Sequence, residues 1–282
     1  MEMATGVPSW LVPGLQDWLK EFMGDIQSQQ RELAVAVQVP VETWDPRKSG
    51  THVAETLTGW FLLDGIDYWL TKLNDIPQRD VITEDEYHHL VWLEEKTEKL
   101  DELLKAGRSA YHVNGRTLRL EQRVDSTVRQ AVEYAADLSA NDAKKHLAHA
   151  WNYAYSLNPN PSQAYAECMR AAECAAIPVV VPNNQLGTLN HVRGELRRDI
   201  DSDTPKWMTS ITVGAGSQGM KTVVSMLDLL IQGQTDRHGG VGPTIPIRQE
   251  AAEAAVHLTA TLVQWFSSGA IRKTDSFSIQ GA

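Results

Sequence analysis

Apolar residues recur at intervals of three and four along most of this 282-residue chain. The clearest run lies between Arg248 and Phe266, where six apolar residues keep this spacing: Ala251, Ala254, Ala255, Leu258, Leu262 and Trp265. Side chains spaced in this way share one face of an α-helix. The sequence therefore predicts a mainly α fold in which helices bury their apolar faces against each other.

The helical pattern predicts helices at about 13–23, 51–73, 83–104, 125–139, 142–156, 161–176, 187–200, 218–231 and 248–267. Thr83 and Glu86 match a capping box at the start of one of them. Prolines mark several of the interruptions, because a proline inside a helix removes a hydrogen bond. On this ground we expect residues 178–182 to form an extended linker.

One segment departs from the helical pattern. Residues 110–113 and 116–120 have strand character, and Asn114-Gly115 between them favours a tight type I′ turn. We expect this β-hairpin, residues 109–121, to end an N-terminal helical region that covers residues 1–122. A helical domain at 123–272 and a C-terminal tail at 273–282 would follow.

Composition and charge limit the class of protein. Hydrophobic residues make up 42% of the chain and charged residues 22%, as in soluble globular proteins. No apolar run is long enough to span a bilayer and the N-terminus lacks the pattern of a secretion signal. We therefore expect a cytoplasmic protein with no membrane contact. Cys168 and Cys174 are six residues apart in a predicted helix, which disfavours a disulfide between them. The net charge of −10 argues against broad nucleic-acid binding but allows a local basic site.

The stretch Gly233-Gln-Thr-Asp-Arg-His-Gly-Gly-Val-Gly242 lies between two predicted helices and carries the main candidate site. Its glycines let the backbone turn sharply beside Asp236, Arg237 and His238. Arginine offers a fixed positive fork, and histidine can move a proton near neutral pH, so the three residues suit a phosphate-handling site. The alternative is a polar turn, because Gly and Asp are common in turns for local reasons.

Three other groups of residues are weaker candidates. Arg193 and Arg197 share a helix face and form a local positive patch with Arg198, which suits phosphate, an acidic partner or simple solvation. Residues 214–222 resemble a nucleotide-binding loop, but Met220 separates its last glycine from Lys221 and no parallel sheet is predicted. His146 and His149 could share a face, but no third ligand follows nearby in sequence. We therefore expect no metal and no cofactor.

The C-terminal half, roughly residues 125–272, resembles the abortive-infection C-terminal type of HEPN-like domain. The resemblance rests on residues 164–178, 181–184, 187–190, 234–239 and 250–260, and on their order along the chain. The whole chain also resembles uncharacterised actinobacterial and phage-borne proteins. The HEPN resemblance implies an α-helical bundle that forms a homodimer and cleaves RNA without metal at the dimer interface.

For this chain, the resemblance implies a metal-independent endoribonuclease or toxin of phage defence or phage competition. Its partners would be RNA and an antitoxin or phage protein. The catalytic residues would be Asp236, Arg237 and His238. The RNA-binding residues would be Arg193, Arg197, Lys221 and Gln234.

HEPN ribonucleases separate the arginine from the histidine by four to six residues, whereas Arg237 and His238 are adjacent. The alternative is therefore a non-catalytic HEPN-like module that binds RNA, a nucleotide or a protein partner. A structural dimer, in which the turn only fixes helix geometry, is a third interpretation.

Overall fold

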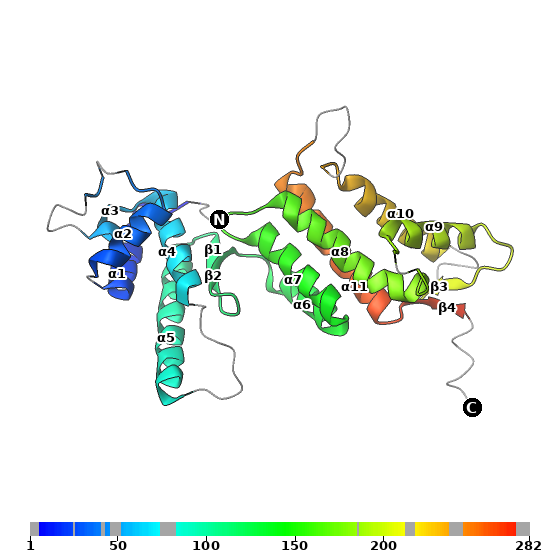
Figure 1. The fold of residues 1–282 in the computed structure, drawn as a ribbon, viewed down its shortest axis with the longest axis horizontal. Coiled ribbons are helices and arrows are strands. Elements are labelled where there is room, and N and C mark those ends of the chain that lie inside the picture. The colour runs from blue at the N-terminus through cyan, green and yellow to red at the C-terminus, as the bar shows by residue number, and fades with distance from the viewer. Residues whose placement is uncertain are drawn as a thin grey trace. The chain divides into compact units, whose positions relative to one another are not determined.

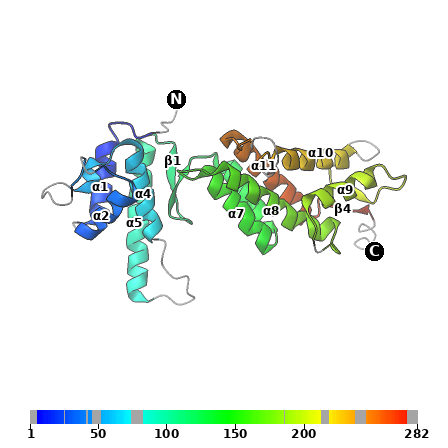
Figure 2. The same ribbon diagram turned by 45° about the horizontal axis from the view of Figure 1, so that its top comes forward.

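The computed structural model describes residues 6–24, 26–40, 43–45, 52–73, 83–184, 186–211, 218–236 and 245–274. The chain divides into two compact units, residues 1–123 and 124–282. Both units are mainly helical, as predicted, and each holds one small antiparallel sheet of two strands (Figures 1 and 2). None of the helices in the described ranges combines the length and the apolar character needed to cross a bilayer.

The N-terminal unit contains five described helices and one hairpin. They are α1 (Val12–Met23), α2 (Gln27–Ala36), α3 (Val53–Thr56), α4 (Gly59–Leu73), α5 (Glu84–Ala106), β1 (Tyr111–Asn114) and β2 (Arg119–Gln122). The predicted single helix at 51–73 is wrong, because Leu57 is extended and Gly59 has a φ of 54°. The pattern also missed α2, which buries only three residues of a largely polar sequence. The capping box of Thr83 and Glu86 is confirmed.

The hairpin turn is longer than predicted. Asn114 pairs with Arg119, so the loop has four residues rather than two. Asn114 causes this, because its side-chain oxygen accepts from the backbone N–H groups of Arg116 and Thr117. Its carbonyl oxygen accepts from Leu118 N, at 2.8 Å, and the φ of Leu118 is 48°. The side chain therefore stabilises a wider loop than a type I′ turn.

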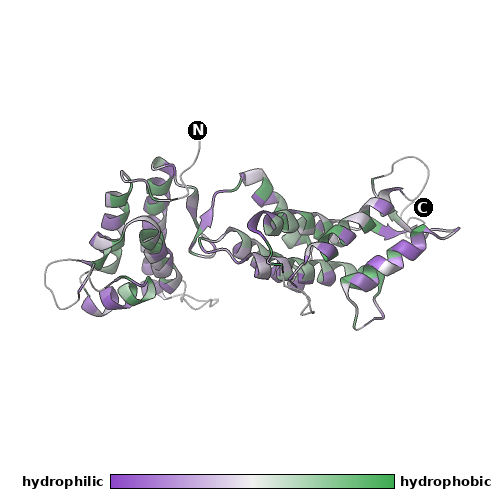
Figure 3. Ribbon diagram, turned by 90° about the horizontal axis from the view of Figure 1, so that it is seen from above, coloured by the Kyte–Doolittle hydropathy of each residue, from purple (hydrophilic) through white to green (hydrophobic). Residues whose placement is uncertain are grey.

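A buried carboxylate joins the hairpin to α4. Asp67 accepts from Leu120 N and from Arg119 Nη2, each at 2.7 Å. Asp67 and Leu120 are both buried, and Figure 3 shows hydrophobic and hydrophilic residues alternating along the helices of this unit. Trp60 and Phe61 on α4 are about half exposed and do not belong to the core.

The C-terminal unit contains six described helices and two short strands. They are α6 (Ser126–Leu138), α7 (Asn141–Tyr155), α8 (Pro161–Val180), α9 (Leu189–Ile200), β3 (Trp207–Thr209), α10 (Gln218–Gly233), α11 (Gln249–Ser267) and β4 (Ile271–Lys273). Helix α8 packs against α7, α9 and α11, and α10 packs against α9 (Figure 1). The β3–β4 sheet shows that the prediction of one hairpin was incomplete. Strands of three residues are too short to produce a readable alternation.

Two details of this unit differ from the sequence pattern. Helix α8 continues through Pro178 to Val180, so the expected extended linker at 178–182 is wrong over its first three residues. Pro178 lies in the last turn, where its missing N–H removes only one helical bond, and Val180 is buried. In α11 the buried stripe includes Ala252, Val256 and Val263, whereas Ala251 and Ala254 are exposed. Alanines on several faces of this helix hide its true inner face from a periodicity argument.

Candidate functional site

Four polar side chains meet where α7 packs against α8. His146 and His149 are three positions apart on α7 and therefore share a face. Glu167 and Arg170 are three positions apart on α8, and their face is turned towards these histidines. We call these four residues the α7–α8 cluster.

Glu167 is the centre of the cluster. Its Oε2 lies 2.6 Å from His146 Nδ1 and 3.9 Å from His149 Nδ1, and its Oε1 is bonded to Arg170 Nη1. The side chain of Glu167 is 7% exposed, whereas those of His146, His149 and Arg170 are 30%, 60% and 54% exposed. A buried carboxylate needs such partners, because an unpaired buried charge is costly. One carboxylate thus bonds to His146 and Arg170 and lies next to the imidazole of His149 at the surface of the unit.

The cluster contains the third metal ligand whose absence led us to expect no metal. That expectation rested on the lack of a third ligand close to His146 and His149 in sequence. The structure supplies a candidate from the next helix, because one ligand atom from each of His146, His149 and Glu167 lies within 4.8 Å of the other two. Two imidazoles and a carboxylate form a ligand set that zinc enzymes use.

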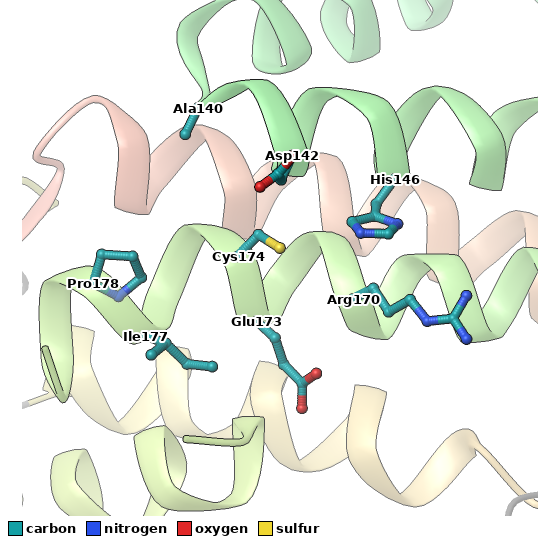
Figure 4. Close-up of a pocket in the computed structure, with 8 residues that line it drawn as sticks. All are labelled: Ala140, Asp142, His146, Arg170, Glu173, Cys174, Ile177 and Pro178. Carbon is teal, nitrogen blue, oxygen red and sulfur yellow. The ribbon is translucent and has the colours of Figure 1, made fainter. Parts of the chain in front are cut away.

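A pocket of about 470 Å³ adjoins the cluster and shares His146 and Arg170 with it (Figure 4). Asp142 and His146 line the pocket from α7, and Arg170, Glu173, Cys174 and Ile177 line it from α8. Glu173 points away from α7 in Figure 4, and its Oε1 accepts from Leu189 N at the start of α9. The lining therefore carries the guanidinium of Arg170 together with the carboxylates of Asp142 and Glu173.

Neither cysteine has the properties of a nucleophile. Both thiols are free, as expected from their spacing. Burial raises the pKa of Cys168 to about 12 and also raises the pKa of Cys174. A thiol reacts as its thiolate, so these environments suppress reaction at neutral pH.

The predicted catalytic stretch is only partly visible. Arg237 and His238 lie outside the described residues, whereas Asp236 is partly buried in the turn that follows α10. Thr235 Oγ1 donates to Ile245 O at 2.8 Å, so the two described ends of this segment are joined. Gln234 is partly buried and Lys221 is exposed.

Gly233 makes a close contact just before this turn. A Cβ placed on Gly233 would lie 2.1 Å from the hydroxyl of Tyr165, which donates to Leu230 O at 2.9 Å. Burial raises the pKa of Tyr165 to about 12. The end of α10 therefore rests on the side of α8 that carries Tyr165.

The contacts of Tyr165 and Glu167 separate the two candidate sites. These residues are two positions apart on α8, which turns them by about 200° around the helix axis. Tyr165 faces the end of α10, whereas Glu167 faces α7. The α7–α8 cluster and the described start of the predicted loop thus lie on different sides of α8.

Two of the predicted RNA-binding residues share one acidic partner. Arg193 Nη1 and Arg197 Nη2 lie 3.0 Å and 2.7 Å from the two carboxylate oxygens of Asp228 on α10. The prediction that they share a helix face is confirmed, but their charge is partly balanced within the chain. An RNA phosphate at this position would compete with Asp228.

Glu167 and Arg170 were not predicted from the sequence. The available signal was the repeated spacing of three, His146 to His149 and Glu167 to Arg170, on two helices separated by a short proline turn. Short connections make consecutive helices antiparallel neighbours.

No family model matches this chain, and neither does any curated protein or any solved structure.

Proposed function

We propose that the C-terminal unit cleaves RNA by a metal-independent reaction at the α7–α8 cluster. The observation that carries the proposal is the 2.6 Å contact between His146 Nδ1 and the buried Glu167, with His149 and Arg170 around the same carboxylate. RNA provides its own nucleophile, the 2′-hydroxyl. The enzyme therefore needs a proton acceptor, a proton donor and positive charge for the phosphate. The cluster contains one group for each task.

His146 is the proton acceptor in this proposal. When its Nδ1–H donates to Glu167 Oε2, the lone pair of Nε2 is left for a substrate hydroxyl. The ring lines the pocket and is partly exposed, so a nucleotide can reach it. Glu167 orients the ring and stabilises the imidazolium that forms when the proton arrives.

His149 and Arg170 complete the reaction. The 2′-oxygen attacks phosphorus and the bond from phosphorus to the 5′-oxygen breaks, which leaves a 2′,3′-cyclic phosphate and a 5′-hydroxyl. The proton of the 2′-hydroxyl moves to His146, and protonated His149 gives a proton to the 5′-oxygen. Arg170 stabilises the negative charge on the phosphate, and its bond to Glu167 holds the guanidinium beside the pocket.

Charge favours a local contact with RNA rather than a long basic groove. Residues 124–282 contain 13 Lys and Arg and 15 Asp and Glu, a net charge of −2. Lys144 and Lys145 precede His146 and pair with the exposed carboxylates of Asp137 and Asp142. Exposed pairs of this kind contribute little stability, so phosphates can replace these partners. We expect RNA affinity to fall with salt, with the slope of a few phosphate contacts.

Cleavage of labelled single-stranded RNA by the full chain, in buffer containing EDTA, tests this function. His146→Ala and Glu167→Gln should each lower the rate by roughly 100-fold or more. His88→Ala removes an exposed histidine from α5 and serves as the matched control, with the rate of the unaltered chain. An all-deoxy oligonucleotide should stay intact, because it lacks the nucleophile. Absence of cleavage by the unaltered chain, or a normal rate in His146→Ala, would contradict the proposal.

The loop residues Asp236, Arg237 and His238 stay predicted catalytic residues from the resemblance. The same assay on His238→Ala separates the two locations. Loss of cleavage in His238→Ala with a normal rate in His146→Ala would assign the chemistry to the loop. The reverse result would assign it to the α7–α8 cluster.

The resemblance also supports a biological role. We propose a HEPN-like toxin of phage defence or phage competition that works in the cytoplasm as a homodimer, with an antitoxin or phage protein as partner. Light scattering after gel filtration measures the oligomeric state, and a monomer would oppose the dimer. Sequencing of total RNA from cells that express the unaltered chain or His146→Ala measures the cellular activity.

Binding without cleavage is the second candidate function. The adjacency of Arg237 and His238 favours it, because HEPN ribonucleases separate these two residues by four to six positions, and the net charge of the chain is −10. It predicts RNA or nucleotide binding with no product, and an affinity that does not change in His146→Ala. Detection of cyclic-phosphate product would oppose it.

A further inference from the structure

We propose that His146, His149 and Glu167 form a binding site for a divalent transition-metal ion of the zinc class. The proposal rests on the ligand geometry and does not depend on the RNA-cleaving function. Two imidazoles and one carboxylate suit Zn²⁺ and related ions, whereas Mg²⁺ and Ca²⁺ prefer sets of oxygen ligands.

The present separations are close to those that such an ion needs. Ligand atoms bound to a tetrahedral zinc ion at about 2.1 Å lie about 3.4 Å apart. The distances from Glu167 Oε2 to the Nδ1 atoms of His146 and His149 are 2.6 Å and 3.9 Å, one shorter and one longer than this value. The third pair of ligand atoms, from His146 and His149, also lies within 4.8 Å, so movements at the ends of the side chains would bring all three atoms to a common centre. The ion would replace the proton between His146 and Glu167.

The surroundings of Glu167 are also those of a ligand. Its second oxygen, Oε1, is bonded to Arg170, which fixes the carboxylate and directs Oε2 towards the histidines. Groups that hold a ligand in this way are a regular part of metal sites. The 60% exposure of His149 leaves the outer side of the site open to water, so the ion can enter and a fourth position stays free.

Metal binding and the proposed cleavage exclude each other. An imidazole that binds a metal through Nδ1 carries its proton on Nε2, so His146 could not accept the proton of a 2′-hydroxyl. Zn²⁺ is therefore expected to inhibit RNA cleavage at the α7–α8 cluster. In that case the ion would act as an inhibitor of a reaction that runs without metal.

Titration of the full chain with Zn²⁺ against a chromophoric chelator tests the site. We expect one ion that binds at this site, with an affinity lowered at least about tenfold in His149→Ala and in Glu167→Gln. His149 is largely exposed, so its replacement should leave the fold intact, which circular dichroism can check. His88→Ala should bind as the unaltered chain does, and excess Mg²⁺ should not compete. Absence of Zn²⁺ binding, or equal binding in His149→Ala and Glu167→Gln, would overturn the proposal.

RNA cleavage distinguishes this inference from the proposed function. If the unaltered chain cleaves no RNA but binds Zn²⁺, and this binding is lost in His149→Ala, the metal-site proposal is supported and the nuclease proposal is refuted. If the chain cleaves RNA in EDTA but does not bind Zn²⁺, the nuclease proposal is supported and the metal-site proposal is refuted. Cleavage that Zn²⁺ leaves unchanged, in a chain with the ion bound, would refute mutual exclusion.

Discussion

Replacing Gly233 with alanine should destabilise the C-terminal unit, although alanine is normally the better helix residue. Gly233 is the last residue of α10, and its added Cβ would lie 2.1 Å from the Tyr165 hydroxyl and 3.1 Å from the ring carbon Cζ. The hydroxyl must therefore move by about 1 Å to reach an ordinary contact distance. The ring is buried among apolar residues of the core, so little free space receives it.

The opposing free energies can be compared. Movement of Tyr165 breaks its 2.9 Å bond to Leu230 O, which costs about 1–2 kcal/mol. Forcing an extra methyl group into a packed region costs about 1–3 kcal/mol. The gain from replacing glycine with alanine in a helix is at most about 1 kcal/mol, and less at a helix end. We expect the free energy of unfolding to fall by about 3 kcal/mol in Gly233→Ala.

A double-mutant cycle with Tyr165→Phe isolates this contact. Phenylalanine removes the hydroxyl, so the nearest atom to the new Cβ is the ring carbon at 3.1 Å, which has to move only a few tenths of an ångström. Tyr165→Phe alone should cost about 1 kcal/mol for the lost bond. Gly233→Ala should then cost less than about 1 kcal/mol when Tyr165→Phe is already present. The expected coupling is about 2 kcal/mol.

Amide hydrogen exchange in peptides from α8 and α10 reports the stability of this unit apart from the other one. Gly194→Ala in the middle of α9 is the matched control, because a Cβ at Gly194 would meet no atom within 4 Å. It should stabilise the unit by about 0.5–1 kcal/mol. An equal cost of Gly233→Ala with and without Tyr165→Phe, or a similar destabilisation by Gly194→Ala, would refute the predicted clash with the Tyr165 hydroxyl.

Three further predictions concern other contacts. Cys168 should resist a thiol reagent at pH 8 until the protein unfolds, because burial raises its pKa to about 12. The pKa of Cys174 is also raised, so Cys174 should react more slowly than free cysteine but faster than Cys168. Asp67→Ala should lower the stability of the N-terminal unit by about 3 kcal/mol, because it leaves the Leu120 N–H buried without an acceptor. Asp67→Asn keeps an acceptor and should cost less. Hydrogen exchange in β2 measures both effects. Asp125 caps the start of α6, and the bond from Thr127 N to its carboxylate lowers the pKa of Asp125. The ionised carboxylate therefore stabilises α6 at neutral pH. This contribution is lost as the pH falls through the lowered pKa, below the usual range of aspartate. Protection of the α6 amides from hydrogen exchange should therefore depend less on pH in this acidic range when Asp125 is replaced by Asn, and an unchanged dependence would contradict the assignment.

The sequence predicted the helical class and several helix boundaries, because these depend on local patterns. The capping box at Thr83 is an example, since both of its partners lie within four residues. The inner face of α11 was not predictable in this way, because alanines are spread around the helix and only packing against α6, α7 and α8 selects a face. The hairpin loop was misjudged because the Asn114 side chain competes for the backbone N–H groups of the turn.

The candidate site shows the same division between local and tertiary information. The spacing of His146 and His149 was visible in the sequence, but their shared partner, Glu167, comes from another helix. A carboxylate 18 residues after His149 becomes its neighbour only because α7 and α8 pack antiparallel. The Arg193 and Arg197 pair was visible too, whereas its neutralisation by Asp228 depends on how α9 meets α10.

All four residues of the α7–α8 cluster belong to one helical hairpin, Asn141–Tyr155 followed by Pro161–Val180. A recombination event with breakpoints outside this hairpin would transfer the complete cluster to another helical scaffold. Random drift in the rest of the domain would leave the four side chains together as long as these two helices stay packed. The side chains of the proposed site thus come from one short segment of the sequence.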